Sequence, residues 1–313
     1  MRVLVTGGAG FIGSHLVGLF LEQGHEVTVL DDLSTGKREN LPRDARLRLL
    51  VGDLTDQAAL EEALAGQEAF VHLAAVASVE ASVRDPVATH RTNLEGSVRL
   101  FDLAARLGVR RALYASSAAV YGDNPALPLS EGAEKRPLSP YAADKLAGEH
   151  YLSHFHRAGH LRGTAFRFFN VFGPRQDPSS PYSGVISVFL DRAARGAPIT
   201  VYGDGEQTRD FVYVGDVVRA LAQALTAPAA GAAELPVFNV GRGAQVSLLQ
   251  LLDVVGRLPG VGRLAVSHAE PRQGDIRHSL ADVTRLRATG WEPLTSLEEG
   301  LRATYASLST PTG

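Results

Sequence analysis

Short runs of apolar and β-branched residues alternate with amphipathic stretches through the first half of the chain. This alternation predicts βαβ units and a parallel sheet. The expected strands are Arg2–Thr6, Glu26–Leu30, Arg48–Val51, Ala69–Leu73, Arg111–Ala115 and Gly163–Phe169. The expected helices are Phe11–Leu21, Gln57–Leu64, Asn93–Leu107 and Tyr141–Arg157. The pattern indicates an α/β, doubly wound fold, in which ligands bind at the carboxyl ends of the strands.

The pattern changes after Asn170. Gly173–Gly184 is rich in Pro, Ser and Gly, which predicts a long loop. Shorter predicted elements follow, the strands Ile199–Tyr202, Phe211–Val214, Val237–Val240 and Leu264–Val266 and the helices Val185–Arg195, Asp216–Leu225 and Leu248–Leu258. We therefore expect a large domain over residues 1–172, with a return segment near 211–245, and a smaller α/β lobe over 173–313.

Composition and charge argue against several classes of protein. The 313 residues include no cysteine, which excludes disulfides, thiol nucleophiles and cysteine-ligated metals. A net charge of -3 without a run of like charge gives no support to a nucleic-acid or membrane partner. The start lacks a signal peptide, and no apolar run reaches the about 20 residues of a membrane helix. We expect a cytoplasmic protein and no metal site.

A glycine-rich segment, TGGAGFIGSHL, follows the first predicted strand. Gly7, Gly10 and Gly13 fit G-x-x-G-x-x-G, and Gly8, Gly10 and Gly13 fit G-x-G-x-x-G. Such glycines allow a tight turn, close approach of a pyrophosphate, and packing of the next helix, whose amino end faces the phosphates. The segment predicts a Rossmann-like dinucleotide site.

Acidic residues at the ends of later strands refine this prediction. Asp31 and Asp32 end the second strand, near the offset of the acid that binds the adenosine ribose. An acid there opposes a 2′-phosphate, so NAD is favoured over NADP. Asp53 and Leu54 follow the third strand. They would lie near the adenine, although Asp53 equally suits a helix N-cap.

A serine, a tyrosine and a lysine form the candidate catalytic group. The fifth strand runs into SSAAVYG, and YAADK opens a long helix, so Tyr141 and Lys145 share one helical face. An ammonium and a positively charged nicotinamide ring would lower the tyrosine pKa from near 10 and make it a usable base. Lysine occurs only three times, at Lys37, Lys135 and Lys145, which argues against an incidental pair.

These motifs, together with FRFFNVFGPRQDP, DGEQTRDFVYVGDVV, PRQGDIRHSLAD and GWEP, span nearly the whole chain. The chain resembles the extended short-chain dehydrogenases/reductases of the NAD-dependent epimerase/dehydratase family, especially their UDP-glucose 4-epimerase-like branch. The resemblance implies Tyr141 as the base, Lys145 as its partner on the nicotinamide ribose, and Ser117 as the donor to the reacting hydroxyl. It places further residues beside NAD: Phe11, Ile12, Leu73, Ala74, Ala75, Asn93, Ser116 and Phe168.

The same resemblance implies contacts to a nucleotide sugar. Asn170, Arg209, Arg272 and Asp275 match positions that hold the diphosphate and nucleoside. The planar guanidinium groups of arginines suit phosphate oxygens. Ser279 falls at a gate beside the hexose, where a small side chain admits N-acetylated sugars.

The absence of acidic residues after Ser117 narrows the range of reactions that we expect. Related dehydratases carry an Asp-Glu pair after the active serine, and decarboxylases keep a glutamate, where this chain has Ala118 and Ala119. We therefore expect inversion at C4 of a UDP-sugar through a transient 4-keto sugar. The alternatives are another nucleotide sugar (a UDP-uronic acid, an ADP- or a GDP-sugar) and a non-catalytic NAD(H)-sensing protein. The resemblance also implies a homodimer built on the long helices Asn93–Leu107 and Tyr141–Arg157.

Overall fold

The computed structural model describes residues 1–178, 184–227, 233–271 and 276–309. The chain forms two compact units, and each is built from more than one stretch of sequence. The first unit comprises Met1–Gly122, Lys135–Phe168 and Val218–Phe238. The second unit comprises Asp123–Glu134, Phe169–Val217 and Asn239–Gly313.

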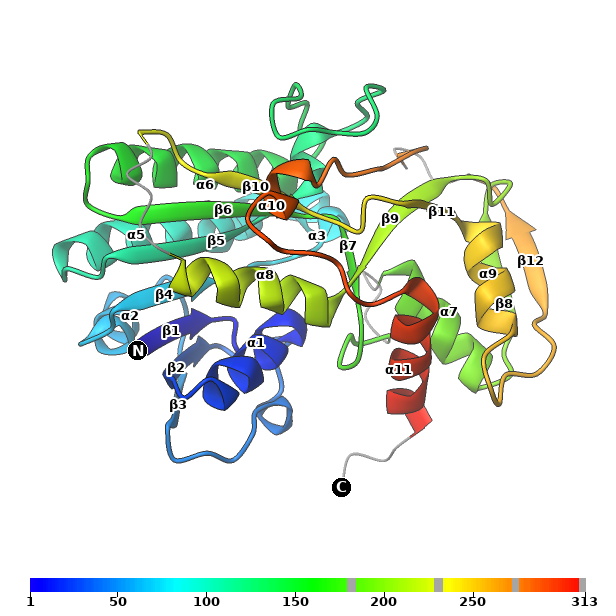
Figure 1. Cartoon of the computed structure of the whole chain (residues 1–313), viewed down its shortest axis with the longest axis horizontal. Coiled ribbons are helices and arrows are strands. Elements are labelled where there is room, and N and C mark those ends of the chain that lie inside the picture. The colour runs from blue at the N-terminus through cyan, green and yellow to red at the C-terminus, as the bar shows by residue number, and fades with distance from the viewer. Residues whose placement is uncertain (179–183, 228–232, 272–275, 310–313) are drawn as a thin grey trace. The chain divides into compact units, whose positions relative to one another are not determined.

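A seven-stranded sheet in the order β10-β6-β5-β4-β1-β2-β3 organises the first unit (Figure 1). Its strands are β1 (Arg2–Thr6), β2 (Glu26–Asp31), β3 (Leu47–Val51), β4 (Ala69–His72), β5 (Arg111–Ser117), β6 (Arg162–Phe168) and β10 (Val237–Val240). The neighbouring pairs from β3 through β6 are all parallel. The reversal of strand order beside β1 and β4 is that of a doubly wound sheet, which confirms the expected α/β fold.

Helices cover both faces of this sheet, which explains why its central strands are largely buried and rich in apolar residues. They are α1 (Phe11–Glu22), α2 (Gln57–Leu64), α3 (Val79–Arg84), α4 (Pro86–His90), α5 (Gly96–Arg106), α6 (Pro140–Arg157) and α8 (Val214–Thr226), with short turns η1 (Arg38–Asn40), η2 (Arg91–Glu95) and η3 (Ala118–Tyr121). Helices α5 and α6 pack together on one face, where Phe101 and Leu152 of the helices join Phe70 and Tyr114 of the sheet in one core. Helices α1 and α8 lie on the other face (Figure 1).

The second unit contains two small sheets. Strand β9 (Thr208–Tyr213) pairs in parallel with β7 (Asn170–Phe172) and antiparallel with β11 (Gln245–Ser247). Strand β8 (Ile199–Tyr202) pairs in parallel with β12 (Val266–Ala269). The remaining helices are α7 (Val185–Ala194), α9 (Leu248–Gly256), α10 (Thr284–Arg287) and α11 (Leu297–Ser309). Their apolar faces enclose a core that includes Phe172, Leu190, Val201, Leu251 and Leu301.

The structure differs from the expected elements at three places. The expected helix from Asn93 begins as the π-helical turn η2 and becomes α-helical at Gly96. The strand expected over Leu264–Val266 instead begins at Val266, where pairing with Ile199 starts. Within the expected return segment, α8 and β10 supply chain to the first unit, whereas β9 pairs with β7 and β11. In the described residues, no helix combines the length and apolarity that a bilayer crossing requires.

Candidate active site

The glycine turn connects β1 to α1 and packs against the end of β4. Gly7 has φ of +70°, and a Cβ built on it would lie 2.7 Å from the backbone nitrogen of Ala74. A Cβ on Gly13 would lie 2.1 Å from the carbonyl oxygen of Gly7. Only glycine fits at both positions. Gly10 precedes α1, and no described side chain caps that helix end, so its first N–H groups suit a pyrophosphate.

The three acids expected near adenosine have different surroundings. Asp31 is nearly buried, and its carboxylate accepts hydrogen bonds from Ala9 N at 2.9 Å and Leu33 N at 2.9 Å. Burial raises the pKa of Asp31, while these backbone bonds oppose the shift. Asp32 and Asp53 are exposed and accept bonds from the serine or threonine two residues later. The helix cap considered for Asp53 is instead Asp56, which accepts bonds from Ala58 N and Ala59 N.

A buried chain of hydrogen bonds supports the loop after β4. His72 links Thr6 Oγ1, 2.7 Å from its Nδ1, to Ser97 Oγ, 2.8 Å from its Nε2. Ser97 donates its own proton to the carbonyl of Asn93, so His72 must donate through Nε2 and accept at Nδ1. Burial lowers the pKa of His72 to about 3, with a smaller contribution from the Lys145 charge, which keeps the ring neutral.

The side chain of Asn93 continues this chain of bonds to the strand end where Leu73, Ala74 and Ala75 lie. Its Oδ1 accepts a bond from Val76 N at 2.8 Å, and its Nδ2 donates to Val76 O at 3.1 Å. Asn93 is nearly buried and lies within η2. The π-helical turn therefore places an amide against the loop, where it fixes the backbone path beside the glycine turn.

Ser117, Tyr141 and Lys145 come together at the carboxyl end of β5. Ser117 caps η3 by accepting a bond from Ala119 N at 3.2 Å, and its side chain also hydrogen-bonds Tyr141. Lys145 is 3% exposed, donates to Ala115 O at 2.8 Å, and has its Nζ 5.9 Å from the centre of the Tyr141 ring. Ser139 caps α6 and fixes the helix that carries both tyrosine and lysine. The structure thus brings together the three residues that the sequence singled out.

Burial controls the ionisation of this group. It lowers the pKa of Lys145 to about 8, although the nearby Asp144 carboxylate opposes the shift. It raises the pKa of Tyr141, and the hydrogen bond from Ser117 acts in the opposite direction. The expected lowering of the tyrosine pKa is therefore not a property of the chain alone. It requires a positive charge of the kind that the nicotinamide ring carries.

Other residues expected beside NAD also belong to this unit. Phe168 pairs with Ser117 in the register of β5 and β6 and is 9% exposed. Leu54 is buried, whereas Phe11 and Ile12 at the start of α1 are half-buried. The hydroxyl of Ser116 points into the protein and donates to Glu149 Oε1 at 2.5 Å.

Apart from Ser117, the described residues expected to contact the sugar nucleotide belong to the second unit. Asn170, at the start of β7, pairs with Phe211 on β9, and Arg209 lies on the same strand β9. Ser279 N donates to Thr208 O at 3.2 Å, which places the proposed gate beside Arg209. Arg209 donates to the carbonyl of Thr208 at 2.9 Å. Arg272 and Asp275 lie outside the described residues.

Two acids of the DFVYVGDVV motif prove to be structural, a role that the motif itself did not indicate. Asp210 is buried and accepts bonds from Arg242 N, Gly243 N and Ala281 N. Asp216 accepts bonds from the backbone of Leu294 and Thr295. The sequence does contain a signal for such a role, namely an acidic residue within a strand or helix of apolar residues. A carboxylate buried there needs several hydrogen-bond donors.

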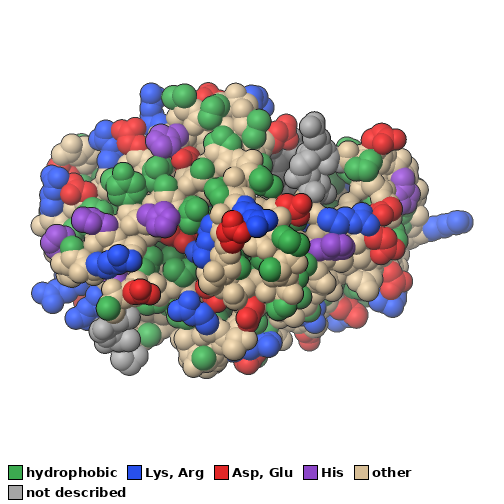
Figure 2. Space-filling model, turned by 90° about the horizontal axis from the view of Figure 1, so that it is seen from above, with side chains coloured by type: hydrophobic (Ala, Val, Ile, Leu, Met, Phe, Trp, Pro, Cys, Tyr) green, Lys and Arg blue, Asp and Glu red, His purple; other side chains and the backbone are tan. Residues whose placement is uncertain are grey.

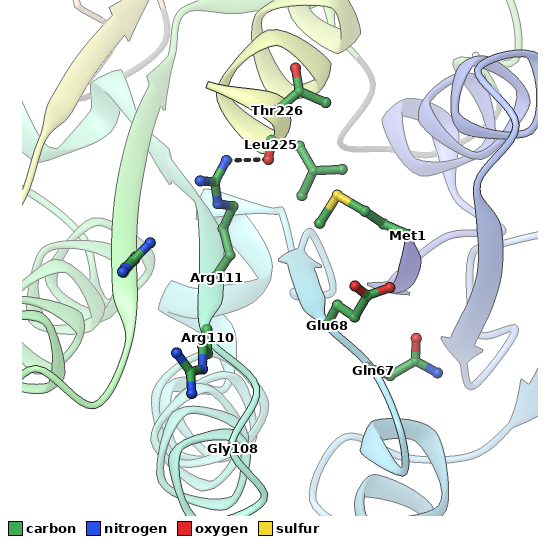
Figure 3. Close-up of a pocket in the computed structure, with 9 residues that line it drawn as sticks. Met1, Gln67, Glu68, Gly108, Arg110, Arg111, Leu225 and Thr226 are labelled. Carbon is green, nitrogen blue, oxygen red and sulfur yellow. Dashed lines mark hydrogen bonds between the residues drawn. The ribbon is translucent and has the colours of Figure 1, made fainter. Parts of the chain in front are cut away.

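A cavity of about 530 Å³ lies at the opposite, amino end of the strands, among residues that include Arg110, Arg111, Arg162 and Met1 (Figure 3). Arg111 donates to the carbonyls of Ala224, Leu225 and Ala227. Figure 3 shows the side chains of Arg110 and Arg111 pointing away from each other. The two guanidinium groups do not converge on a ligand. Arg111 instead donates hydrogen bonds to carbonyl groups at the carboxyl end of α8.

Comparisons with known proteins agree with this geometry. Residues 3–241 match the model of the NAD dependent epimerase/dehydratase family. A UDP-glucose 4-epimerase of Mycolicibacterium smegmatis is 42% identical over 311 residues, covering 97% of each chain. The Thermus thermophilus UDP-glucose 4-epimerase in complex with NAD is 40% identical with a TM-score of 0.91, over 99% of this chain and 100% of that one.

Similar proteins differ in the sugar named for them. A Methanobrevibacter ruminantium UDP-N-acetylglucosamine 4-epimerase, solved with UDP-N-acetylmuramic acid, is 39% identical with a TM-score of 0.92, over 98% of this chain and 97% of that one. Other similar chains are named for UDP-glucuronate. These proteins have in common the inversion of C4 on UDP-sugars.

Proposed function

The chain belongs to the NAD-dependent epimerase/dehydratase family and its relatives include UDP-sugar 4-epimerases; on this premise, we propose that it interconverts UDP-glucose and UDP-galactose. We propose that it also accepts the UDP-N-acetylhexosamine pair. The observation that carries the proposal is the convergence of Ser117, Tyr141 and Lys145 at the carboxyl end of β5. That group lies in the same unit as the glycine turn.

The residues of the first unit fit a dinucleotide. The glycine turn leaves room for a pyrophosphate at the start of α1, and Asp31 presents a carboxylate from the end of β2. Leu73, Ala74 and Ala75 follow β4 with two small side chains beside that turn. NAD, when bound, supplies the acceptor and donor of a hydride at C4 of the sugar.

The chain's own residues handle the proton. Tyr141 takes the proton of the C4 hydroxyl and returns it at the end of the cycle, which suits a phenol held by Ser117. With substrate bound, Ser117 turns its single hydroxyl proton from Tyr141 to the same sugar oxygen and keeps it in line. The Lys145 ammonium, held on Ala115 O, favours the phenolate electrostatically.

Ala118 and Ala119 support epimerisation over dehydration. They form the start of η3 directly after Ser117, and the amide of Ala119 is bonded to the Ser117 hydroxyl. Methyl side chains at these positions move no proton from neighbouring carbons. A keto sugar formed there is returned to an alcohol, provided that it can turn in the pocket before the hydride comes back.

Two alternatives differ in observable ways. A UDP-uronic acid, an ADP-sugar or a GDP-sugar remains the second candidate for the substrate, because relatives differ in the sugar. A non-catalytic NAD(H)-sensing protein would have no need of Tyr141 and Lys145 in this arrangement. A panel of nucleotide sugars incubated without added NAD, followed by NMR, separates these options. We expect C4 epimers with the UDP-hexoses. Epimers formed only from a uronic acid, or only from a sugar on another nucleotide, would show that this sugar is the substrate. No product from any nucleotide sugar would support the non-catalytic NAD(H)-sensing protein.

We also propose a homodimer through α5 and α6, together with the neighbouring α3 and α4. Of the apolar residues on the two long helices, Phe101 is fully buried in the core, whereas Tyr151 is 45% exposed. Val83 and Val87 add apolar side chains that are 63% and 70% exposed. Figure 2 shows hydrophobic and histidine side chains among charged ones on the face that it views. A matching patch on a second copy would cover these residues.

A further inference from the structure

A buried ion pair lies directly behind the candidate catalytic group. Arg167 Nε donates to Glu149 Oε1 at 2.9 Å, and Arg167 Nη2 donates to Oε2 at 2.6 Å. The side chains are 4% and 5% exposed. Removing two charges from water is costly and is sustained only where the pair is bidentate and the remaining polar atoms are bonded.

The other polar atoms of this pair are bonded to the strand end. The Ser116 hydroxyl donates to Glu149 Oε1 at 2.5 Å, and Arg167 Nη1 donates to the hydroxyl of Tyr121 at 2.9 Å. Ser116 and Tyr121 are themselves buried. We call these four residues, Ser116, Tyr121, Glu149 and Arg167, the buried network.

The elements that carry the network are those that carry the catalytic group. Glu149 lies on α6, four residues after Lys145 and eight after Tyr141, so it belongs to the same helical face. Ser116 immediately precedes Ser117 on β5, and Arg167 pairs with Ser116 in the register of β5 and β6. The Glu149 carboxylate therefore links the strand that ends in Ser117 directly, by a hydrogen bond, to the helix that presents Tyr141.

We propose that Glu149 and Arg167 are positioning residues for proton transfer. The Arg167 fork fixes the orientation of the Glu149 carboxylate, and that carboxylate fixes the Ser116–Ser117 strand end relative to α6. The separation of the Ser117 and Tyr141 hydroxyls is thus set by a rigid ion pair and not by the segment between residues 122 and 139. The inference rests on the proposed roles of Ser117 and Tyr141.

A purely structural role makes a different prediction. Buried ion pairs are often replaced by apolar side chains of similar volume without loss of stability. If the pair only fills space, the double variant Glu149→Met/Arg167→Met folds and keeps the kcat of the wild type. If the pair positions the strand end, the same double variant folds but reacts slowly, because a displacement of about 1 Å costs about 100-fold in rate.

The decisive experiment measures kcat, KM, melting temperature and bound NAD for three variants with UDP-glucose. Ser116→Ala removes the bond between Ser116 and Glu149, Tyr121→Phe removes the hydroxyl that accepts from Arg167 Nη1, and the double methionine variant removes the pair. We expect kcat to fall about 3- to 10-fold in Ser116→Ala and about 10- to 100-fold in the double variant, with KM and NAD content within about twofold. For Tyr121→Phe we expect a fall in kcat no larger than that of the double variant.

The matched control is the exposed pair Glu298–Arg302 on α11, whose Nη2–Oε1 distance is 2.8 Å. Glu298→Met/Arg302→Met leaves all four quantities unchanged. Unchanged kcat in folded, NAD-loaded Ser116→Ala and double variants overturns the positioning role. If the double variant does not fold, the outcome for Ser116→Ala decides alone. An inactive wild-type protein would instead contradict the proposed function, so the two failures are distinguishable.

Discussion

Lys145 is the residue whose surroundings most directly govern the proposed chemistry. Its ammonium is nearly buried, donates to Ala115 O and lies near the rings of Tyr114 and Tyr141. The YAADK spacing predicts that Tyr141 and Lys145 share a helical face. The spacing does not give the depth of burial, which depends on β5 packing over the helix.

The ionisation of Lys145 predicts a pH dependence. Its pKa is lowered to about 8, so the ammonium is present below that value and is lost as the pH rises through it. Because the charge supports the phenolate, kcat/KM should decline above about pH 8. Lys145→Arg, which stays protonated, should be slower but should keep its remaining activity to higher pH. A pH profile in which both proteins decline at the same alkaline pH would rule out this role of Lys145.

Ser279 offers a test of substrate width. Its backbone pairs with Thr208 beside Arg209 in the second unit. We expect Ser279→Tyr to lower kcat/KM for UDP-N-acetylglucosamine at least about 10-fold more than for UDP-glucose, because a bulky ring competes with the acetamido group. An unchanged ratio of the two rates would show that Ser279 is not the gate. Ser267→Tyr, on exposed strand β12 of the same unit, is the matched control.

At the scale of elements, motifs with short sequence spacing were predictable and long-range polar contacts were not. The glycine turn and the tyrosine–lysine pair lie within single turns or helices, so spacing alone indicates them. His72 meets Thr6 across 66 residues, and Glu149 meets Ser116 across 33. No local pattern links such partners, because strand order in the sheet brings them together. Asp210 and Asp216 were missed for the same reason.

The helix after the glycine turn provides a matched pair of substitutions. Gly13→Ala brings a Cβ to 2.1 Å from Gly7 O and should abolish retention of NAD by the purified protein. Gly18 lies in the same helix α1, and a Cβ added there would meet nothing within 4 Å. Gly18→Ala should retain NAD and raise the free energy of unfolding by up to about 1 kcal/mol. Cofactor released by heat denaturation and measured by absorbance compares the two; equal NAD content would contradict the packing argument.

At the scale of the whole molecule, the sequence predicted the parallel sheet and a return segment near 211–245, but not that part of the first half of the chain belongs to the second unit. Residues 123–134 belong to the second unit although they lie within the first half of the chain. Val218–Phe238 return to the first unit, and β10 joins the seven-stranded sheet beside β6. Periodicity identifies a strand but not which of the three sheets it joins.

The proposed homodimer predicts a change of mass on substitution of exposed valines. Val83→Glu/Val87→Glu places two charges in the apolar patch on α3 and α4 and should convert a dimer to a monomer in sedimentation experiments. Leu294→Glu, at a side chain that is 72% exposed in the second unit, is the control and should leave the mass unchanged. A wild-type monomer at micromolar concentration would contradict the dimer.

Inversion of C4 by Tyr141 is the central claim, and one measurement tests it most directly. Purified wild-type protein and Tyr141→Phe are incubated with UDP-glucose without added NAD, and the anomeric proton signals are followed by NMR. The account predicts that the wild type forms UDP-galactose until the two sugars reach equilibrium. It predicts that Tyr141→Phe retains NAD and is slower by about 100-fold or more. No C4 epimer from the wild type, or an equal rate in Tyr141→Phe, would contradict it.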